Sequence, residues 1–478
     1  MLTKEQMIDY LQCDISSFNF QDLYDLVISK ENCINCGACL AICPRISINE
    51  NEPKLIDYDP ECSLCYKYCP QTFFPKKLLR KEIFKHKNYQ NSLLGDFQKI
   101  LAAKSTDNKI LQNSQNGGVV TTLLCTALNT GLVDGVLMVN KDENWYPKPF
   151  IARTQEEIIS AAGSIYTMIP LISAYRDAVY KFEIENLAFV GLPCQIPAVR
   201  KFQFWPPLSN KYGKFKLIIG LFCSSNYSYD SMLNLVHDLN GISMKDIKKF
   251  DVSHGKFISY LKDGSIKEIS INKTNKYHYS SCKYCKDYTA EFADISVGSV
   301  GAPHDNWNSV IIRSDAGNQL FKKALKHQKL IISMDVNLNK IKRASKRKKV
   351  QITKTSDEIY SALKIFNISK PAVEIYTILV SLGEADFNTL IEVINLKPEI
   401  IYNGLNTLRQ RKWILKDNNL YHPINPSHVI KNEINEFMSK FKNHIDMIKR
   451  KILKDLDTIF IQNNLMELKN LDFMESIF

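Results

Sequence analysis

The feature that most constrains this chain is a run of four closely spaced cysteines near its start. The run consists of Cys33, Cys36, Cys39 and Cys43 in the pattern C-x2-C-x2-C-x3-C, followed by Pro44. Two-residue gaps let three thiolates converge from one tight loop on a face of an iron-sulfur cubane, and Gly37 permits the close backbone turn. The run therefore predicts a 4Fe-4S cluster site, with zinc thiolates or buried structural cysteines as the alternatives.

A second copy of the motif follows and makes the pattern that of a two-cluster bacterial ferredoxin. Cys62, Cys65, Cys69 and Pro70 match the first copy, while Asp59 stands where the leading cysteine belongs. In such ferredoxins the fourth cysteine of each run ligates the other cluster. Crossed ligation then assigns one cluster to Cys33, Cys36, Cys39 and Cys69. The other receives Cys43, Cys62 and Cys65, with Asp59, a water or nothing at its last iron.

Four later cysteines lie in suggestive places. Cys194 and Cys223 each follow a strand-like run, and Cys282 and Cys285 are separated by two residues. Ligands gather at the carboxyl ends of strands in α/β sheets, so the first two thiols could meet the second pair there. From spacing alone, a cluster, a zinc site and unrelated thiols all remain open. Cys125, in an apolar helical run, is expected to pack in the core.

Length and composition indicate a multidomain protein without membrane insertion. The chain has 478 residues, more than one hydrophobic core usually serves. Its N-terminus lacks a secretory signal, and no apolar run reaches the roughly 18 residues that span a bilayer. We therefore expect a cytoplasmic protein, in which 13 cysteines act as metal ligands or redox groups.

The net charge of +12 is partly local. Residues 340–354 contain eight basic side chains and no acidic one. Contact with nucleic acid is one interpretation of this basic run, and a solvated linker or helix face is the favoured one.

Changes in hydrophobic pattern predict an α/β (α+β) multidomain fold. Between residues 97 and 343, helical stretches alternate with strand-like runs at 135–139, 187–190, 216–222, 293–297 and 309–312. The expected segments are a helical lead-in at 1–30, a ferredoxin-type 4Fe-4S domain with its connector at 31–92, an α/β domain at 93–345, a winged helix at 346–426 and a long amphipathic helix at 427–478.

Small-residue turns recur through the α/β region. Ser114 to Gly118 form a glycine turn that opens a helix, where backbone N–H groups and the helix dipole can hold a phosphate. Similar turns lie at residues 162–166, 191–193 and 296–301. One such turn is weak evidence of a ligand, but several in one α/β domain suit a large dinucleotide cofactor.

Together these segments resemble a known family between about residues 33 and 343. In order they read SQNGGVVT, AAGSIYTMIP, FVGLPCQIPA, GLFC, SSCKYCKDYTAEFADISVGSVGAP and VIIR. They are similar to the beta subunit of coenzyme F420-reducing hydrogenase and to related deazaflavin dehydrogenase and reductase subunits. The resemblance implies FAD, which splits the hydride of reduced coenzyme F420 into single electrons, and an internal 4Fe-4S cluster that accepts them.

Carried over residue by residue, the resemblance implies cluster ligands and flavin contacts. The internal cluster would be held by Cys194, Cys223, Cys282 and Cys285. The candidate FAD and deazaflavin contacts are Ser114, Gln115, Gly117, Gly118, Gly163, Ser164, Tyr166, Gly191, Gln195 and Gly298. With the ferredoxin motifs, two to three clusters would form an electron path.

The C-terminal region looks like a winged helix of the archaeal TrmB-like type. Residues 372–382, 386–394 and 398–412 read as three helices, and residues 413–421 read as a two-stranded wing. The third helix would present Tyr402, Asn403, Asn406, Arg409 and Arg411 to DNA, with Lys397, Lys412 and Lys416 as phosphate contacts. Docking of a protein is the alternative role.

The final helix carries one continuous apolar stripe. Its members recur every three or four residues at Ile430, Ile434, Phe437, Phe441, Ile445, Ile448, Ile452, Leu456 and Ile459. Pairing of two subunits as a homodimer is favoured slightly over packing on its own domain.

The sequence thus favours an F420-dependent oxidoreductase, or an electron-input subunit that serves a redox partner protein or a hydrogenase or reductase subunit. The alternative is a redox-sensing, DNA-binding transcriptional regulator that uses the same cofactors as a sensor. Steady oxidation of reduced F420 would distinguish the first from the second.

Overall fold

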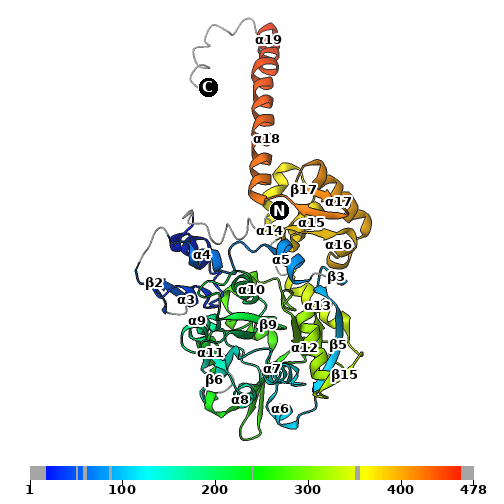
Figure 1. The fold of residues 1–478 in the computed structure, drawn as a ribbon. Helices are drawn as coiled ribbons and strands as arrows, with labels where there is room; N and C mark the ends of the chain where they lie inside the picture. Colours follow the sequence, from blue (N-terminus) through cyan, green and yellow to red (C-terminus); the bar gives the residue numbers. More distant parts are fainter. Residues whose placement is uncertain are drawn as a thin grey trace. The chain divides into compact units, whose positions relative to one another are not determined.

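The computed structural model describes residues 18–49, 52–57, 62–84, 89–238, 241–349 and 356–463. The chain divides into two compact units, Met1–Gln351 and Ile352–Phe478 (Figure 1). Cys13 and Asp59, the second of which is a candidate cluster ligand, lie outside the described residues.

The cysteine-rich segment begins the first unit with short elements. Asn19 caps the first helix with a capping box, because its side chain accepts from the Asp22 N–H while Asp22 accepts from the Asn19 N–H. The elements are α2 (Phe20–Leu23), the π-helical turn η1 (Tyr24–Ile28), α3 (Ala38–Ile42), β1 (Ile46–Asn49), β2 (Glu52–Leu55), α4 (Leu64–Tyr68), α5 (Lys76–Ile83), β3 (Tyr89–Asn91) and β4 (Gly95–Phe97).

An eight-stranded mixed sheet forms the centre of this unit, in the order β15-β5-β14-β13-β9-β8-β6-β7. Its strands are β5 (Lys99–Ser105), β6 (Gly135–Lys141), β7 (Pro147–Ala152), β8 (Asn186–Gly191), β9 (Lys214–Leu221), β13 (Ile295–Gly298), β14 (Asn308–Ile312) and β15 (Leu330–Ser333). β6, β8, β9 and β13 pair in parallel, and β14 is antiparallel to both β13 and β5. The α/β prediction is confirmed, and each strand-like run lies on or overlaps a strand.

Both faces of the sheet are apolar, since successive side chains of a strand point to opposite faces. Leu187 and Phe189 of β8 belong to one buried cluster, whereas Ala188 and Val190 belong to another. The helices of the unit are α6 (Asn108–Asn113), α7 (Val119–Asn129), α8 (Gln155–Ser160), α9 (Tyr175–Tyr180), α10 (Ile196–Phe204), α11 (Tyr229–Asp238), α12 (Asp315–Lys326) and α13 (Leu338–Lys349), with 3-10 turns η2 (Leu171–Ala174), η3 (Met244–Asp246), η4 (Ile271–Tyr277) and η5 (Ser280–Tyr284). Cys125 is buried in α7 within the second cluster, as expected.

A smaller antiparallel sheet packs on its own apolar cluster. It has the order β10-β11-β12, with β10 (Ile247–Ser253), β11 (Lys256–Leu261) and β12 (Ile266–Ser270). Phe250 and Phe257 are its buried centre and pack against Tyr227 and Trp145. This sheet brings β10 next to the Ser114–Gly118 turn, because Gln115 Nε2 donates to the Phe250 carbonyl at 3.1 Å.

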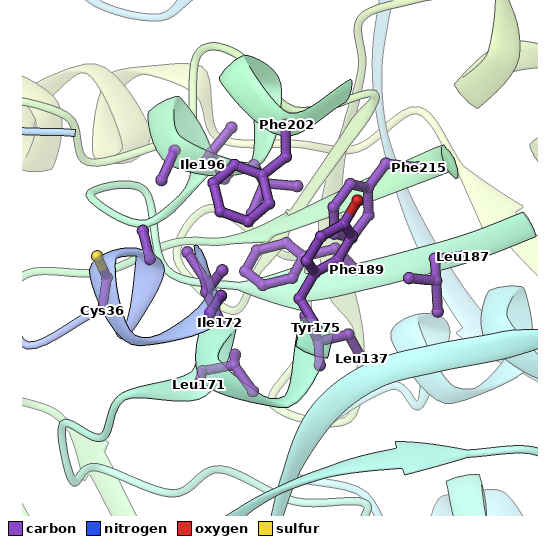
Figure 2. Packing of buried hydrophobic residues seen from close by; sticks show 14 of the residues in the cluster. Cys36, Leu137, Leu171, Ile172, Tyr175, Leu187, Phe189, Ile196, Phe202 and Phe215 are labelled. Carbon is purple, nitrogen blue, oxygen red and sulfur yellow. The ribbon is translucent and has the colours of Figure 1, made fainter. Parts of the chain in front are cut away.

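The first cysteine loop packs against the main core of the unit (Figure 2). Cys36 lies beside Ile172 at the edge of the cluster that contains Tyr175 and Phe202. The Ile172 N–H donates to the Cys36 carbonyl at 2.8 Å. Gly37 has φ +82°, and an added Cβ would lie 2.5 Å from the Pro170 carbonyl oxygen, so only glycine allows this approach.

α13 corrects the expectation for the basic run. The run does form a helix, and Lys340, Arg343 and Arg347 are exposed on it. Lys348 and Lys349, however, are buried, at 6% and 8% exposure. The run is therefore not simply a solvated face, because its last turn directs two cations toward the interior.

The second unit has the element order expected of a winged helix. After α14 (Ser356–Leu363) and η7 (Lys364–Phe366) it contains α15 (Lys370–Leu382), β16 (Ala385–Asp386), α16 (Phe387–Val393), α17 (Pro398–Gln410), β17 (Ile414–Asp417) and β18 (Leu420–Pro423). Gly383 caps α15 with φ +83°, and Asn418 and Asn419 form the turn of the wing with positive φ. The three strands pair in the order β16-β18-β17.

The final helix is long and little covered. It comprises α18 (Pro426–Met447), the π-helical turn η8 (Ile448–Ile452) and α19 (Leu453–Asn463). Val429 is its buried residue, whereas Ile434, Phe441 and Leu456 of the apolar stripe are exposed. The stripe therefore does not pack on its own domain over most of its described length.

Of the described helices, none alone is long and apolar enough to cross a membrane. The bent pair Asp357–Phe366 and Lys370–Leu382 meets the length and composition test only when its two helices are taken together.

A buried ion pair joins α10 to the large sheet. Arg200 Nη2 lies 3.0 Å from Asp294 Oδ1, and the two side chains are 2% and 4% exposed. Asp294 also accepts from the Ile218 N–H at 2.7 Å and from Ser314 Oγ at 2.5 Å. Both carboxylate oxygens of Asp294 thus have a partner, and the negative charge of Asp294 balances the Arg200 guanidinium.

We expect Asp294→Ala to lower the free energy of unfolding of the first unit by about 3–5 kcal/mol, because it leaves the Arg200 guanidinium buried without a counter-charge. Glu143→Ala removes an exposed carboxylate and should change the value by less than about 0.5 kcal/mol. Urea titrations of both variants would measure this. Equal midpoints for the two variants would contradict the assignment.

Candidate functional site

Four cysteines from three segments of the α/β region converge at one edge of the large sheet. Cys194 follows β8, Cys223 follows β9, and Cys282 and Cys285 lie at η5. Cys194 and Cys285 hydrogen-bond to each other, and this bond raises the pKa of Cys194 and lowers that of Cys285. The Cys223 and Cys282 thiols lie within electrostatic range of Cys194. We call these four residues the inner thiol set.

A buried lysine faces the inner thiol set. Lys348 Nζ donates to the Cys223 carbonyl at 2.5 Å. Burial lowers the pKa of Lys348, but Cys223, Cys285, Cys194 and Cys282 raise it by more, so the net shift is upward. The sequence analysis missed Lys348, because nothing in a basic run tells which lysine turns inward.

The N-terminal cysteines lie within electrostatic range of one another, and crossed ligation stays a prediction that would divide them into two sets. Burial raises the pKa of Cys36 most, and the nearby Cys69 and Cys33 raise it further. Cys39 has Cys36, Cys33 and Cys69 as its first electrostatic neighbours. For Cys65, whose pKa burial raises to about 12, the next contributions come from Cys62 and Cys43. The first thiol set is therefore Cys33, Cys36, Cys39 and Cys69, and the second is Cys43, Cys62 and Cys65.

The first thiol set lines a pocket of mostly apolar walls. All four of its cysteines border this pocket, together with Leu23, Val27, Ile28, Ile34, Pro53 and Pro70. Lys201 lies beside the set, where its ammonium donates to the carbonyls of Lys67 and Cys69 at 2.8 Å each. Burial lowers the pKa of Lys201 to about 7, although Cys69 and Cys36 act in the opposite direction.

The Tyr279 side chain is within electrostatic range of cysteines of both the first and the inner thiol sets. Burial raises the pKa of its hydroxyl, and Cys33, Glu52, Cys282 and Cys36 raise it further. Its N–H donates to the Asn226 carbonyl at 2.7 Å, and the Asn226 N–H donates to Cys282 Sγ at 3.4 Å. One side chain thus adjoins cysteines more than 240 residues apart in the sequence. No sequence pattern indicated this role.

The chemistry of these donors fits iron-sulfur clusters. Thiols are their usual ligands, and each of the sets of four provides four of them. Among the described residues, no three histidine, cysteine, aspartate or glutamate side chains are grouped as ligands of a single metal ion would be. Four thiolates around one zinc ion at about 2.3 Å would stand about 3.8 Å apart, a closer grouping than a cubane needs.

Part of the predicted flavin set gathers around Gln115. Its side chain accepts from the Ser164 N–H at 3.4 Å and donates to the Phe250 carbonyl, which joins the Ser114–Gly118 turn to the Gly163 loop and to β10. Lys249 Nζ donates to the Gln115 carbonyl at 2.9 Å. Lys249, on β10, was not predicted, because a lysine on a strand carries no motif.

Tyr166 connects this loop to the inner thiol set. Burial raises the pKa of its hydroxyl most, Asp251 raises it further, and Tyr227 and Cys223 make smaller contributions in the same direction. The Cys223 thiol is therefore within electrostatic range of the Tyr166 hydroxyl. Gly163 has φ +106°, and an added Cβ would meet only the Asn113 carbonyl, at 3.6 Å. The loop is thus open at Gly163, as a ligand-facing loop would be.

The other predicted flavin contacts have packing partners within the chain. An added Cβ at Gly191 would lie 2.4 Å from the Phe189 ring, and one at Gly298 would lie 2.1 Å from the Phe222 ring. Gln195 is 3% exposed and accepts from the Leu192 N–H at 3.0 Å. Ser114 Oγ donates to the Ile110 carbonyl at 2.7 Å. These packing contacts and hydrogen bonds do not involve a ligand, and a role of the four residues in flavin binding stays a prediction.

The turn at Gly117 and Gly118 begins α7. Gly118 is the N-cap with φ +69°, and an added Cβ at Gly117 would lie 2.9 Å from both the Ala103 carbonyl oxygen and the Asn308 nitrogen. Asn308 Nδ2 in turn donates to the Gly298 carbonyl at 3.4 Å. This turn therefore lies at the same sheet edge as Gly298, as the parallel strands predict.

A separate open hollow of about 650 Å³ lies beyond β6. Its walls include Asp142, Tyr146, Tyr229, His237 and Met244. None of the predicted cluster or flavin residues lines this hollow, so it is not the site described above.

Comparisons with known proteins identify the family of this region. The family model for the N-terminal part of the coenzyme F420 hydrogenase/dehydrogenase beta subunit matches residues 100–176. The model for the C-terminal part of the same coenzyme F420 hydrogenase/dehydrogenase beta subunit matches residues 184–337. These ranges contain all the predicted flavin contacts and the inner thiol set.

Relatives extend the similarity over nearly whole proteins. The chain is 35% identical to the coenzyme F420 hydrogenase subunit beta of Methanosarcina barkeri over 59% of its own length and 97% of that protein. It is 38% identical to the corresponding protein of Methanothermobacter thermautotrophicus over 49% of its own length and 83% of that protein.

A solved structure shows the same similarity. A chain of the F420-reducing [NiFe] hydrogenase complex from Methanosarcina barkeri matches with a TM-score of 0.54 and 34% identity, over 56% of this chain and 94% of that one. From these matches, this chain belongs to the coenzyme F420 hydrogenase/dehydrogenase beta subunit family, a family of oxidoreductases.

Proposed function

We propose that this chain carries electrons between coenzyme F420 and a redox partner through a bound FAD and three iron-sulfur clusters. The observation that carries the proposal is the continuous order of the sites. The Tyr166 hydroxyl, in the Gly163–Tyr166 loop, is within electrostatic range of Cys223, and the Tyr279 hydroxyl is within electrostatic range of cysteines of both the inner and the first thiol sets. Cys39 of the first set has Cys65 of the second among its electrostatic neighbours.

This order suits the chemistry of the cofactors. When bound, a flavin exchanges two electrons with a hydride carrier and one at a time with a cluster. The chain's residues supply the positions: Gln115, Ser164, Tyr166 and Lys249 would hold the flavin, and the three thiol sets would hold the clusters. Lys249 places a cation where anionic parts of FAD or F420 would be favoured.

A partner complex follows from the relatives. The relatives in Methanosarcina barkeri and Methanothermobacter thermautotrophicus are named as hydrogenase subunits, and another in Methanocaldococcus jannaschii is named as a coenzyme F420-dependent sulfite reductase. We infer that this chain serves a hydrogenase or reductase subunit as its electron partner, in the cytoplasm.

The alternative function, a DNA-binding regulator, depends on the C-terminal unit. The contacts of one expected DNA-contacting side chain in this unit favour the enzyme function instead. We propose a TrmB-like winged helix here, in which Tyr402, Asn403 and Arg409 are exposed on α17 as DNA contact would need. Arg411, however, forms an ion pair with Glu433 at 3.1 Å and donates to the Asn367 carbonyl. The side chain of this expected DNA contact is therefore already bonded to residues of its own unit. A protein-docking role for the module is the simpler interpretation, with or without pairing of two subunits through α18 and α19.

Titration with reduced F420 tests the proposed function directly. Anaerobically purified protein should contain iron, sulfide and FAD, and reduced F420 should bleach its cluster absorbance. With a dye as electron acceptor, turnover should be continuous and should not depend on added DNA. A chain that accepts no electrons from reduced F420 while its clusters are full would exclude this function, and turnover-free, salt-sensitive binding of one promoter would favour the regulator.

Cys282→Ser should remove the inner cluster alone, because serine is a poor replacement for a thiolate ligand of iron. We expect a loss of about four iron atoms per chain, with the N-terminal clusters retained. Cys125→Ser changes a buried cysteine in α7 that belongs to no thiol set and should keep full iron. Iron and sulfide analysis with EPR of the reduced protein distinguishes the two. Equal iron contents would count against the inner site.

Lys249→Ala should weaken flavin binding about tenfold or more, because hydrogen bonds involving a charged group contribute about 1.5–3 kcal/mol. Lys248→Ala on the same strand removes an exposed cation and serves as the control. Fluorescence titration of the flavin-depleted proteins with FAD, and the KM for reduced F420, would measure the effect. If the two variants behave alike, Lys249 does not belong to the cofactor site.

A further inference from the structure

Two neighbouring lysines at the end of α13 are buried, but only one has a carboxylate partner. Lys349 Nζ lies 2.5 Å from Glu291 Oε1 and donates to the Ser92 carbonyl at 2.6 Å. Among the described residues, no carboxylate forms an ion pair with Lys348, whose hydrogen bond goes to the Cys223 carbonyl. A buried ammonium without an anion nearby is costly. The structure around Lys348 therefore calls for negative charge.

The four inner thiols are the main electrostatic neighbours of the Lys348 ammonium, and the Asp287 carboxyl lies within electrostatic range of two of these thiols. Cys223, Cys285, Cys194 and Cys282 are its electrostatic neighbours, and they come from three different connections of the sheet. His278 is also near Lys348, which is within its electrostatic range. Its Nε2 lies 2.9 Å from Ser225 Oγ. Burial and Lys348 both lower the pKa of His278, so the imidazole favours its neutral form.

We propose that Lys348 is the built-in counter-charge of the inner cluster and raises its reduction potential. This inference rests on the proposed function, which places a cluster on the inner thiol set. A cubane with four thiolate ligands is anionic, and it gains one further negative charge when it accepts an electron from the reduced flavin. A fixed cation nearby stabilises the reduced form more than the oxidised form, and burial strengthens the effect.

The position of Lys348 gives this charge a use in electron transfer. In the proposed order of sites, a cluster held by the inner thiol set would be the first acceptor after a bound flavin. A cation at this point would favour electron transfer from the flavin to the cluster. The Lys348 ammonium keeps its proton throughout. Lys348 is thus a potential-setting residue that acts on the cluster without entering the reaction with F420.

Potentiometric titration with EPR of the full-length, anaerobically purified chain tests the proposal. In Lys348→Gln, reduction of the inner cluster at a fixed solution potential should become at least tenfold less favourable, which corresponds to a midpoint lower by about 59 mV. Lys348→Arg keeps the charge and should restore most of the shift. Lys340→Gln, an exposed change on the same helix, should leave the midpoint unchanged.

Iron analysis separates failure of this inference from failure of the proposed function. Full iron with an unchanged midpoint in Lys348→Gln overturns the role of Lys348 alone. Wild-type protein without iron, even after anaerobic reconstitution, overturns the proposed function and this inference with it.

A second measurement needs no variant of Lys348 to fold. In protein with ¹⁵N-labelled lysine side chains, pulsed EPR of the reduced inner cluster should detect a coupled lysine nitrogen. The inner signal is identified as the one that Cys282→Ser abolishes. An inner cluster with no coupled lysine nitrogen would overturn the proposal.

Discussion

The parallel pairing of β8, β9 and β13 is the constraint on which the rest of this structure depends. Parallel strands end at the same edge of a sheet, so the segments that follow β8 and β9 deliver Cys194 and Cys223 to one place. The connection before β13 returns through η5 and adds Cys282 and Cys285. The thiols of three distant segments are thereby held together by backbone hydrogen bonds of the sheet before any cofactor contributes.

α10 links this edge to the N-terminal cysteines. The helix starts just after Cys194, and its consecutive residues Arg200 and Lys201 face different neighbours. Arg200 is bound to Asp294 in the sheet, while Lys201 holds the carbonyls of Lys67 and Cys69. Tyr68 Oη adds a bond to the Trp205 carbonyl at 2.8 Å. One helix thus holds the second cysteine motif in place relative to the inner thiol set, which a short path for electrons requires.

Buried lysines accompany both sets of four thiols. Lys201 lies beside the first set and Lys348 beside the inner set, and both are among the most buried lysines of the described chain. In a low dielectric, such charges are tolerated only where negative charge compensates them. Their position beside the thiols therefore fits a role of these thiol sets as anionic centres. It also gives a structural reason for part of the net positive charge of the chain.

The sequence by itself determined much of the architecture and predicted the ligand types. Fixed spacing identified the N-terminal motifs, since local geometry alone brings Cys33, Cys36 and Cys39 together. Hydrophobic period identified the sheet strands, the helices of the C-terminal unit and the stripe of the final helix. Gln115, Gly163, Ser164 and Tyr166 were found through the family resemblance, and the structure brings them together.

Only the tertiary structure decided which side chains serve the sites from a distance. Tyr279, Lys249, Lys201 and Lys348 stand in no local pattern, because their roles arise from contacts across about 50 to 250 residues of chain. The same reason explains Gly191 and Gly298, where a side chain would collide with the rings of Phe189 and Phe222. The spacing of residues predicts only sites that are formed by residues close in sequence. Burial and charge balance depend on which distant segments the fold brings into contact.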